Sequence, residues 1–265
     1  MFKFNKIGFL LITAFIFTAN AVFAETPEEK GLAIAVEGDN RDKGWGDSTV
    51  KMTMTLKNKQ GDTSKREIRI RSLEVTGDGD KSLSIFDKPR DVRGTAFLTF
   101  SHVGKPDDQW LYLPALKRVK RISSRNKSGP FMGSEFAYED IGSQEVAKYT
   151  YKFLKEESCG ENMTCFVVER YPTDKFSGYT KQVTWVDTKE YRPIKTDFYD
   201  RRKSLLKSLE MTEYQQYLGK FWRPHKMVML NHQTGKSSIL AYSEYNFKTG
   251  LKDSDFNKSK LKRLR

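Results

Sequence analysis

The chain has 265 residues and a formal net charge of +13, from 47 Lys and Arg against 34 Asp and Glu. Hydrophobic residues make up 37% and aromatic residues 13%, which is enough for a packed core and argues against a disordered chain. The mean hydropathy of −0.66 excludes a protein that crosses a membrane many times. The length fits one large domain or two small ones, and all-β barrels of this size are commonly one domain.

Residues 1–24 have the pattern of a secretory signal peptide. A basic start is followed by an apolar stretch at residues 7–19, and Val22 and Ala24 place small residues at the −3 and −1 positions of a cleavage site. The alternative is an uncleaved anchor, although the apolar stretch is short for a membrane span. We therefore expect an exported chain that is cleaved after Ala24. It has no cysteine at the junction and so is not a lipoprotein.

The rest of the sequence alternates between apolar and polar residues with a period of two. A short helix is expected first, at residues 27–39, and a strictly alternating run follows at residues 50–56. Similar runs then recur at regular spacing: 66–75, 81–87, 94–103, 109–113, 116–122, 146–155, 165–171, 179–187, 194–201, 205–217, 221–230 and 237–245. This many short strands predicts a mainly β sandwich or barrel, which we assign to a single domain at residues 25–265.

Residues 127–145 interrupt this pattern with glycines, a proline and large apolar side chains. Phe131, Met132 and Phe136 are the apolar residues that we single out there. A long connection of this kind between two sets of strands is either a lid over a cleft or a plug in the core. The sequence leaves both open, and we take these three side chains as candidate lid residues.

Cys159 and Cys165 are the two cysteines of the chain, separated by five residues that resemble a turn. Because an exported chain matures in an oxidising compartment, we predict a disulfide between them. It is expected at the end of a hairpin formed by residues 146–155 and 165–171. A metal or redox pair is the alternative, but C-x-x-C spacing and a neighbouring histidine are both missing.

No catalytic motif or metal-ligand spacing stands out. The sequence has no G-x-S-x-G motif, and the G-K-S at residues 235–237 lacks the first glycine of a phosphate loop. His102, His225 and His232 are spread along the chain without the spacing of a metal site. We therefore predict no catalytic residue, no metal and no cofactor.

Two basic runs are candidates for docking. The first contains Lys117, Arg118, Lys120 and Arg121, and the second is the C-terminal tail. Anionic lipid head groups or an acidic protein suit an exported chain better than nucleic acid. A solvated strand face and a disordered tail are the plain alternatives. Because neighbouring residues of a strand point to opposite faces, one member of each basic pair is expected to face a cleft.

Aromatic residues are concentrated in the strands between residues 95 and 113. Phe97, Phe100, Trp110 and Tyr112 put apolar side chains on both faces of these strands. One face must then be covered by a packed core, and the other is either a ligand cavity or covered by helices. We take these four residues as candidates for the lining of an apolar cleft.

The sequence resembles the LolA-like family of outer-membrane lipoprotein-sorting proteins, in the branch associated with RND-type exporters. The resemblance is carried by G-W-G-D-S at residues 44–48 and G-T-A-F-L-T-F at 94–100. It continues with D-D-Q-W-L-Y-L-P-A-L-K-R-V-K-R-I at 107–122 and G-P-F-M-G-S-E-F at 129–136. The resemblance covers nearly all of the chain after the signal peptide, from about Leu32 to Phe256.

The resemblance implies a LolA/LppX-like fold, an incomplete (half-closed) antiparallel β-barrel with short helices that form a lid. It also implies a monomeric periplasmic carrier that binds a lipid or the acyl chains of a lipoprotein in an apolar cleft. Such a carrier passes its cargo to or from a membrane exporter, towards the outer membrane. In the known carriers an interior arginine holds the lid, and the sequence alone does not place one here. A lipid hydrolase with the same cleft, or an accessory protein of the exporter, are the alternative functions.

Overall fold

The computed structural model describes residues 25–264, and the predicted signal peptide lies outside this range. The described chain begins with helix α1 (Pro27–Arg41) and continues with thirteen strands. The strands are β1 (Asp47–Lys57), β2 (Thr63–Leu73), β3 (Lys81–Lys88), β4 (Ala96–Phe100), β5 (Asp108–Leu113), β6 (Arg118–Ile122), β7 (Tyr149–Gly160), β8 (Met163–Pro172), β9 (Tyr179–Asp187), β10 (Pro193–Asp200), β11 (Leu205–Tyr217), β12 (Phe221–Asn231) and β13 (Ser237–Phe247). Each of the thirteen alternating runs in the sequence corresponds to one strand.

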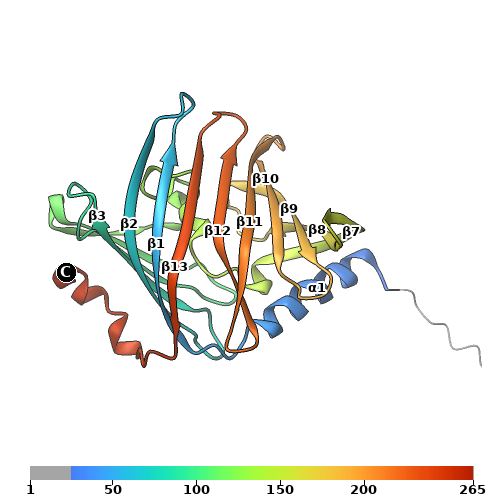
Figure 1. The fold of residues 1–265 in the computed structure, drawn as a ribbon, viewed down its shortest axis with the longest axis horizontal. Coiled ribbons are helices and arrows are strands. Elements are labelled where there is room, and N and C mark those ends of the chain that lie inside the picture. The colour runs from blue at the N-terminus through green and yellow to red at the C-terminus, as the bar shows by residue number, and fades with distance from the viewer. Residues whose placement is uncertain (1–24, 265) are drawn as a thin grey trace, which may run out of the picture.

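All thirteen strands belong to one antiparallel sheet, in the order β6-β5-β4-β3-β2-β1-β13-β12-β11-β10-β9-β8-β7. The first and last strands of the chain meet in the middle, where Met52 of β1 lies opposite Tyr242 of β13. The edges of the sheet are therefore β6 and β7, which do not pair with each other among residues 25–264. The sheet is curved but not closed (Figure 1), which confirms the predicted incomplete antiparallel barrel.

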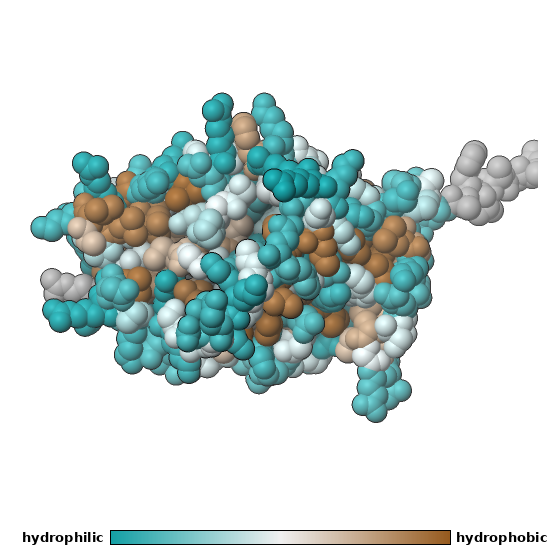
Figure 2. Space-filling model, turned by 90° about the horizontal axis from the view of Figure 1, so that it is seen from above, coloured by the Kyte–Doolittle hydropathy of each residue, from teal (hydrophilic) through white to brown (hydrophobic). Residues whose placement is uncertain are grey.

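The two faces of the sheet bury two different hydrophobic clusters. In β4, Phe97 belongs to a large cluster that also contains Met54, Ile68 and Met229. Its neighbour Leu98 belongs to a second cluster. Because side chains alternate along a strand, these clusters lie on opposite sides of the sheet. We call the face of the large cluster the inner face and the other the outer face. Figure 2 shows that hydrophilic residues cover most of the surface, with hydrophobic residues in several separate areas.

Residues 123–148, here called the plug segment, connect the two edge strands and pack on the inner face. Phe131 and Phe136 have exposed fractions of 1% and 2%. The ring of Phe131 lies 5.0 Å from that of Phe97 and 6.1 Å from that of Phe86. Of the two roles that the sequence left open, these residues therefore form a plug in the core. The segment contains four single-turn 3-10 helices: η2 (Ser124–Asn126), η3 (Phe131–Gly133), η4 (Tyr138–Asp140) and η5 (Val146–Lys148).

A buried ion pair fastens the plug segment to the sheet. Lys207 of β11 donates to Asp140 at 2.8 Å, and the side chains have exposed fractions of 4% and 8%. Lys207 also donates to the carbonyl of Glu135 at 2.8 Å. The hydroxyl of Tyr179 donates to Asp140, and burial together with that carboxylate raises its pKa well above the usual value. Both charged groups thus have more than one hydrogen-bond partner, which offsets the cost of burying them.

The C-terminal residues cover the outer face beside β4 and β5. The segment contains the 3-10 helices η6 (Asp253–Asp255) and η7 (Lys258–Arg263), and a further turn, η1 (Pro114–Leu116), joins β5 to β6. Phe256 and Leu261 have exposed fractions of 3% and 0%, and they complete the outer cluster. The tail is therefore packed on the sheet, contrary to the alternative that it is disordered.

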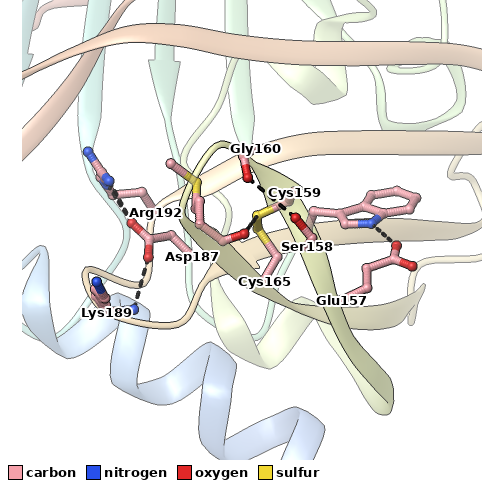
Figure 3. The surroundings of a disulfide bond; sticks show 10 residues. Glu157, Ser158, Cys159, Gly160, Cys165, Asp187, Lys189 and Arg192 are labelled. Atoms are coloured by element: carbon pink, nitrogen blue, oxygen red, sulfur yellow. Dashed lines mark hydrogen bonds and ion pairs between the residues drawn. A yellow bond between two sulfur atoms is a disulfide. The ribbon is translucent and has the colours of Figure 1, made fainter.

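The predicted disulfide joins Cys159 and Cys165, with their Cα atoms 5.8 Å apart (Figure 3). The hairpin is longer than expected, because β7 runs to Gly160 and leaves only Glu161 and Asn162 as the turn. Asn162 has a φ of +55°, a conformation that asparagine tolerates better than most residues. The disulfide therefore lies within the end of the β7–β8 ladder.

We expect the disulfide to add about 2–3 kcal/mol to the free energy of unfolding, because the loop it closes is short. A Cys159→Ser, Cys165→Ser variant should lose this amount and still fold, since the β7–β8 ladder remains. Urea denaturation measures the difference. Intact-mass analysis with alkylation, before and after reduction, checks the bond itself. Two alkylatable thiols in unreduced protein would contradict the assignment.

Candidate functional site

A cavity of about 930 Å³ lies on the inner face, between α1 and strands β7 to β12. Its apolar walls come from both sides. Helix α1 contributes Ile34 and Ala35, and the strands contribute Val186, Met211 and Met227. The volume lies in the range of cavities that hold small-molecule ligands, roughly 300–1,000 Å³. This cavity is the candidate binding site.

Helix α1 covers this cavity and is held in place at both ends. At its start, the side chain of Thr26 caps the helix and the carboxylate of Glu29 accepts from Thr26 in return. Gly31 lies against the backbone of β7, where an added Cβ would be only 2.8 Å from the nitrogen of Phe153. At its end, Arg41 donates to the carbonyl of Lys189 at 2.6 Å. Figure 1 shows α1 beneath the β7–β9 side of the sheet.

An arginine in the lining of the cavity contacts the C-cap residue of α1. Arg223 of β12 donates to Asp42, the C-cap residue, at 2.5 Å. The guanidinium also lies 5.9 Å from the ring of Trp45 and 5.7 Å from that of Phe247. This aromatic surrounding fixes the arginine close to the helix. It is therefore a candidate for the interior arginine that the family resemblance implies.

Acidic residues gather at one end of the cavity. Asp80 lies there with Glu74, Glu145 and Asp42. Burial, and secondly the repulsion from these carboxylates, raises the pKa of Asp80 from its ordinary value to about 7. One hydrogen bond opposes the shift, since the backbone N–H of Val75 donates to Asp80 at 3.2 Å. Ionisation of Asp80 therefore works against the folded state near neutral pH.

We expect Asp80→Asn to stabilise the protein above pH 7, by about 1–2 kcal/mol. The folded state holds the Asp80 proton up to about pH 7. The unfolded chain releases it near pH 4, so the contribution of this group to stability falls as the pH rises from about 4 to 7. The variant should show a flatter pH dependence in thermal melts over this range. Glu161→Gln, an exposed turn residue, is the control. Equal pH profiles for Asp80→Asn and the wild type would contradict the assignment.

The predicted cleft residues do not line this cavity, and the sheet divides them between its two faces. Phe97 is buried on the inner face with Phe131, Phe136 and, partly, Met132. Phe100, Trp110 and Tyr112 pack instead on the outer face, under the C-terminal segment. The expectation that all seven residues share one cleft is therefore wrong. Sequence alternation separates the two faces, but it does not show which face holds a cavity.

The predicted docking residues all lie at the β6 edge, where Lys117, Arg118, Lys120 and Arg121 are exposed. Arg118 and Lys120 lie opposite Leu113 and Leu111, whose side chains pack on the inner face. Arg121 lies on the outer face and pairs with Asp108. Lys117 has a φ of +49° and caps η1, so it is not part of the strand. None of the four lines the 930 Å³ cavity.

In the range 25–264, no helix combines the length and the apolar character needed to cross a membrane. In the same range, no group of three or more His, Cys, Asp or Glu side chains is arranged to hold a metal ion.

Comparison with known proteins identifies the fold and the family. The chain is similar to a crystal structure described as an outer membrane lipoprotein-sorting protein domain from Vibrio parahaemolyticus, with 62% identity and a TM-score of 0.87. The match covers 89% of this chain and 100% of that one. A DUF1329 family protein from Desulfovibrio piger is 30% identical, with a TM-score of 0.84, over 89% of this chain and 99% of that one.

A more distant relative shares the fold. A LolA superfamily protein from Nitrosomonas europaea is 22% identical, with a TM-score of 0.69, over 86% of this chain and 98% of that one. A family model described as uncharacterized protein-like matches residues 78–263. No curated protein matches the chain. The extent and identity of the first match show that the chain belongs to the family of outer-membrane lipoprotein-sorting proteins.

Proposed function

We propose that the protein is a periplasmic carrier that holds a lipid, or the acyl chains of a lipoprotein, in the cavity beneath α1. The observation that carries this proposal is the 930 Å³ cavity with apolar walls on both the helix and the strands. Moving an acyl chain out of water is favourable by about 0.8 kcal/mol for each CH₂ group. A carrier in an aqueous compartment therefore needs a cavity with apolar walls for the acyl chain. Family membership supports the same function.

Helix α1 is the lid in this proposal, in place of the plug segment. It is held by a small cluster around Ile34, Tyr151 and Val168, and by polar contacts that are partly exposed to water, such as the ion pair of Lys30 with Glu156. The plug segment, in contrast, is fastened by the buried pair of Lys207 and Asp140. The helix can therefore move away at a smaller cost than the plug. Arg223 would hold the closed position through Asp42.

The cargo would be passed to or from a membrane exporter, and the direction towards the outer membrane follows from the family. Export through the predicted signal peptide would place the chain in the periplasm, where it would act as a monomer and without a cofactor. The charged end of the cavity gives a lipid head group polar partners, while the apolar walls contact the chain. No step of this function requires bond cleavage, so we propose a carrier rather than an enzyme.

Fluorescent fatty acid binding tests the cavity directly. Ala35→Trp on α1 places a large side chain in the cavity and should weaken binding by at least about tenfold, because it fills the volume that the acyl chain needs. Ala33→Trp on the same helix is the matched control, since Ala33 is exposed and does not line the cavity. Circular dichroism checks that both variants fold.

Mass spectrometry of lipids bound to the native protein identifies the cargo in the same preparations. A defined lipid at near one per chain in the wild type, lost in Ala35→Trp and kept in Ala33→Trp, is the expected result. Turnover of that lipid would instead support the hydrolase. Absence of bound lipid together with equal fatty acid binding by both variants would contradict the carrier.

A further inference from the structure

The fold brings together the two basic runs that lie far apart in the sequence. Strand β6 is an edge of the sheet, and η7 of the C-terminal segment packs on the outer face against β5 and β6. The packing is fixed by Leu261, which is fully buried, and by Lys258, whose amine lies 5.7 Å from the centre of the Trp110 ring. The tail and the edge strand therefore form one surface, which we call the basic edge.

The basic edge has many cations and little compensating charge. Its exposed cations are Lys117, Arg118, Lys120, Arg121, Lys258, Lys260, Lys262 and Arg263. Among the described residues, Arg121 has an acidic partner, Asp108, whereas no acidic side chain pairs with Arg118 or Lys120. The β3–β4 loop lies beside this surface, since Gly94 is close to the ring of Pro114. It adds two exposed cations, Arg90 and Arg93, and one exposed acid, Asp91. A local field of positive sign results.

An exposed leucine projects within this surface. Leu116, at the tip of the β5–β6 hairpin, has an exposed fraction of 63%, the highest among the exposed large hydrophobic residues of the described chain. Lys117 and Arg118 follow it directly. An apolar side chain beside several cations matches the boundary of an anionic bilayer, where head groups meet acyl chains.

We propose that the basic edge docks the protein on an anionic lipid bilayer, with Leu116 inserted at the head-group level. Because β6 is an edge strand, the cations on both of its faces can contact the same bilayer. Arg118 and Lys120 point to one face and Arg121 to the other, and a flat membrane that meets the strand edge-on is within reach of both. The inference goes beyond the proposed cargo binding, because the basic edge and the cavity are separate.

The two edges of the sheet are built differently, which favours docking at β6. The start of β7 is covered by α1, where Gly31 allows close contact with the strand backbone. Lysines on a free edge strand also prevent pairing with a second copy of the chain. Protection of the edge from such pairing requires cations on β6 itself, but it does not require cations on η7 or in the β3–β4 loop. Docking on an anionic bilayer accounts for the cations at all three places.

Vesicle co-sedimentation tests the proposal with phosphatidylcholine vesicles, with and without phosphatidylglycerol. The wild type should bind the anionic vesicles only, and added salt should weaken binding, since surface charges are screened over about 8 Å at physiological ionic strength. Two variants should each lower binding by at least about tenfold. One replaces the strand cations by Gln at positions 117, 118, 120 and 121, and the other replaces the tail cations by Gln at positions 258, 260, 262 and 263.

The matched control removes the same charge from the middle strands of the sheet, away from its β6 edge. It replaces exposed lysines of the β1–β2 and β12–β13 hairpins by Gln, at positions 57, 59, 65 and 236. This control should retain wild-type binding. Equal loss in the control and the two edge variants would show that only net charge matters, and would overturn the proposal. Binding to an acidic protein without binding to anionic vesicles would also overturn it.

Two further variants separate insertion from charge and docking from cargo binding. Leu116→Asn should weaken vesicle binding several-fold, while Leu154→Asn, an exposed leucine on β7, should leave it unchanged. Ala35→Trp should keep vesicle binding even though it loses fatty acid. Self-association of the strand variant with unchanged vesicle binding would assign the cations to edge protection and overturn the proposal.

Discussion

Lys207→Met should reduce the free energy of unfolding by about 3–5 kcal/mol, because it leaves the carboxylate of Asp140 buried without a cation. The side chains of both residues are almost completely buried, and the amine also binds the carbonyl of Glu135. The change therefore removes the charge that fastens the plug segment to β11. Urea denaturation followed by circular dichroism measures the loss.

Two controls test whether burial is the cause. Lys51→Met breaks the ion pair between Lys51 and Glu244, whose side chains are both more than half exposed. This variant should lose less than about 1 kcal/mol of the free energy of unfolding. Adding Asp140→Asn to Lys207→Met should recover part of the stability, because a neutral amide is cheaper to bury than an unpaired carboxylate. A similar loss of stability in Lys207→Met and Lys51→Met would show that the buried ion pair does not hold the plug segment on the sheet.

The sequence could have indicated this pair, although we did not predict it. Lys207, Leu209 and Met211 share one face of β11, and the two apolar residues are buried on the inner side of the sheet. A lysine in the apolar phase of an alternating run needs a buried partner. The partner itself could not be predicted, because Asp140 lies 67 residues away in a connection without regular periodicity.

The strands were predictable because each one carries its own local pattern. Alternation and turn residues are properties of neighbouring residues, so they specify strands β9 and β11 to the residue. The pairing of one strand with another is not a local property. Met52 of β1 lies opposite Tyr242 of β13 in the middle of the sheet, and no pattern in either strand indicates that the two strands pair. The sheet order, and therefore the identity of the edges, required the structure.

The position of the cavity was not predictable for a related reason. The aromatic residues of β4 and β5 were the most prominent apolar feature of the sequence, yet they fill the two clusters instead of leaving space. The cavity instead lies between α1 and strands β7 to β12, and Trp45, Phe221 and Trp222 are among the residues that line it. Large side chains therefore border the cavity as well as fill the core, and their positions in the sequence do not locate it. Arg223 and Asp42 likewise meet only through the fold.

Phe136→Ala should reduce the free energy of unfolding by about 3–5 kcal/mol, the usual cost of removing a buried phenylalanine. The side chain has an exposed fraction of 2% and belongs to the inner cluster, so its removal leaves a cavity within that cluster. For a lid residue, Phe136→Asp would be expected to weaken cargo binding in an intact fold. The structure changes this expectation, because a charge at a buried position without a partner should prevent the plug segment from packing at all.

Fatty acid binding measured together with urea denaturation distinguishes the two roles of residue 136. A plug residue should lose stability first, and Phe136→Ala that still folds at low temperature should bind fatty acid as the wild type does, because the residue does not line the cavity. A lid residue should show the reverse, with normal stability and weak binding. Leu154→Ala, with an exposed fraction of 42%, is the control for stability and should change it by less than about 0.5 kcal/mol. Normal stability of Phe136→Ala with lost binding would return the plug segment to the role of a lid, and α1 would then be part of the fixed wall.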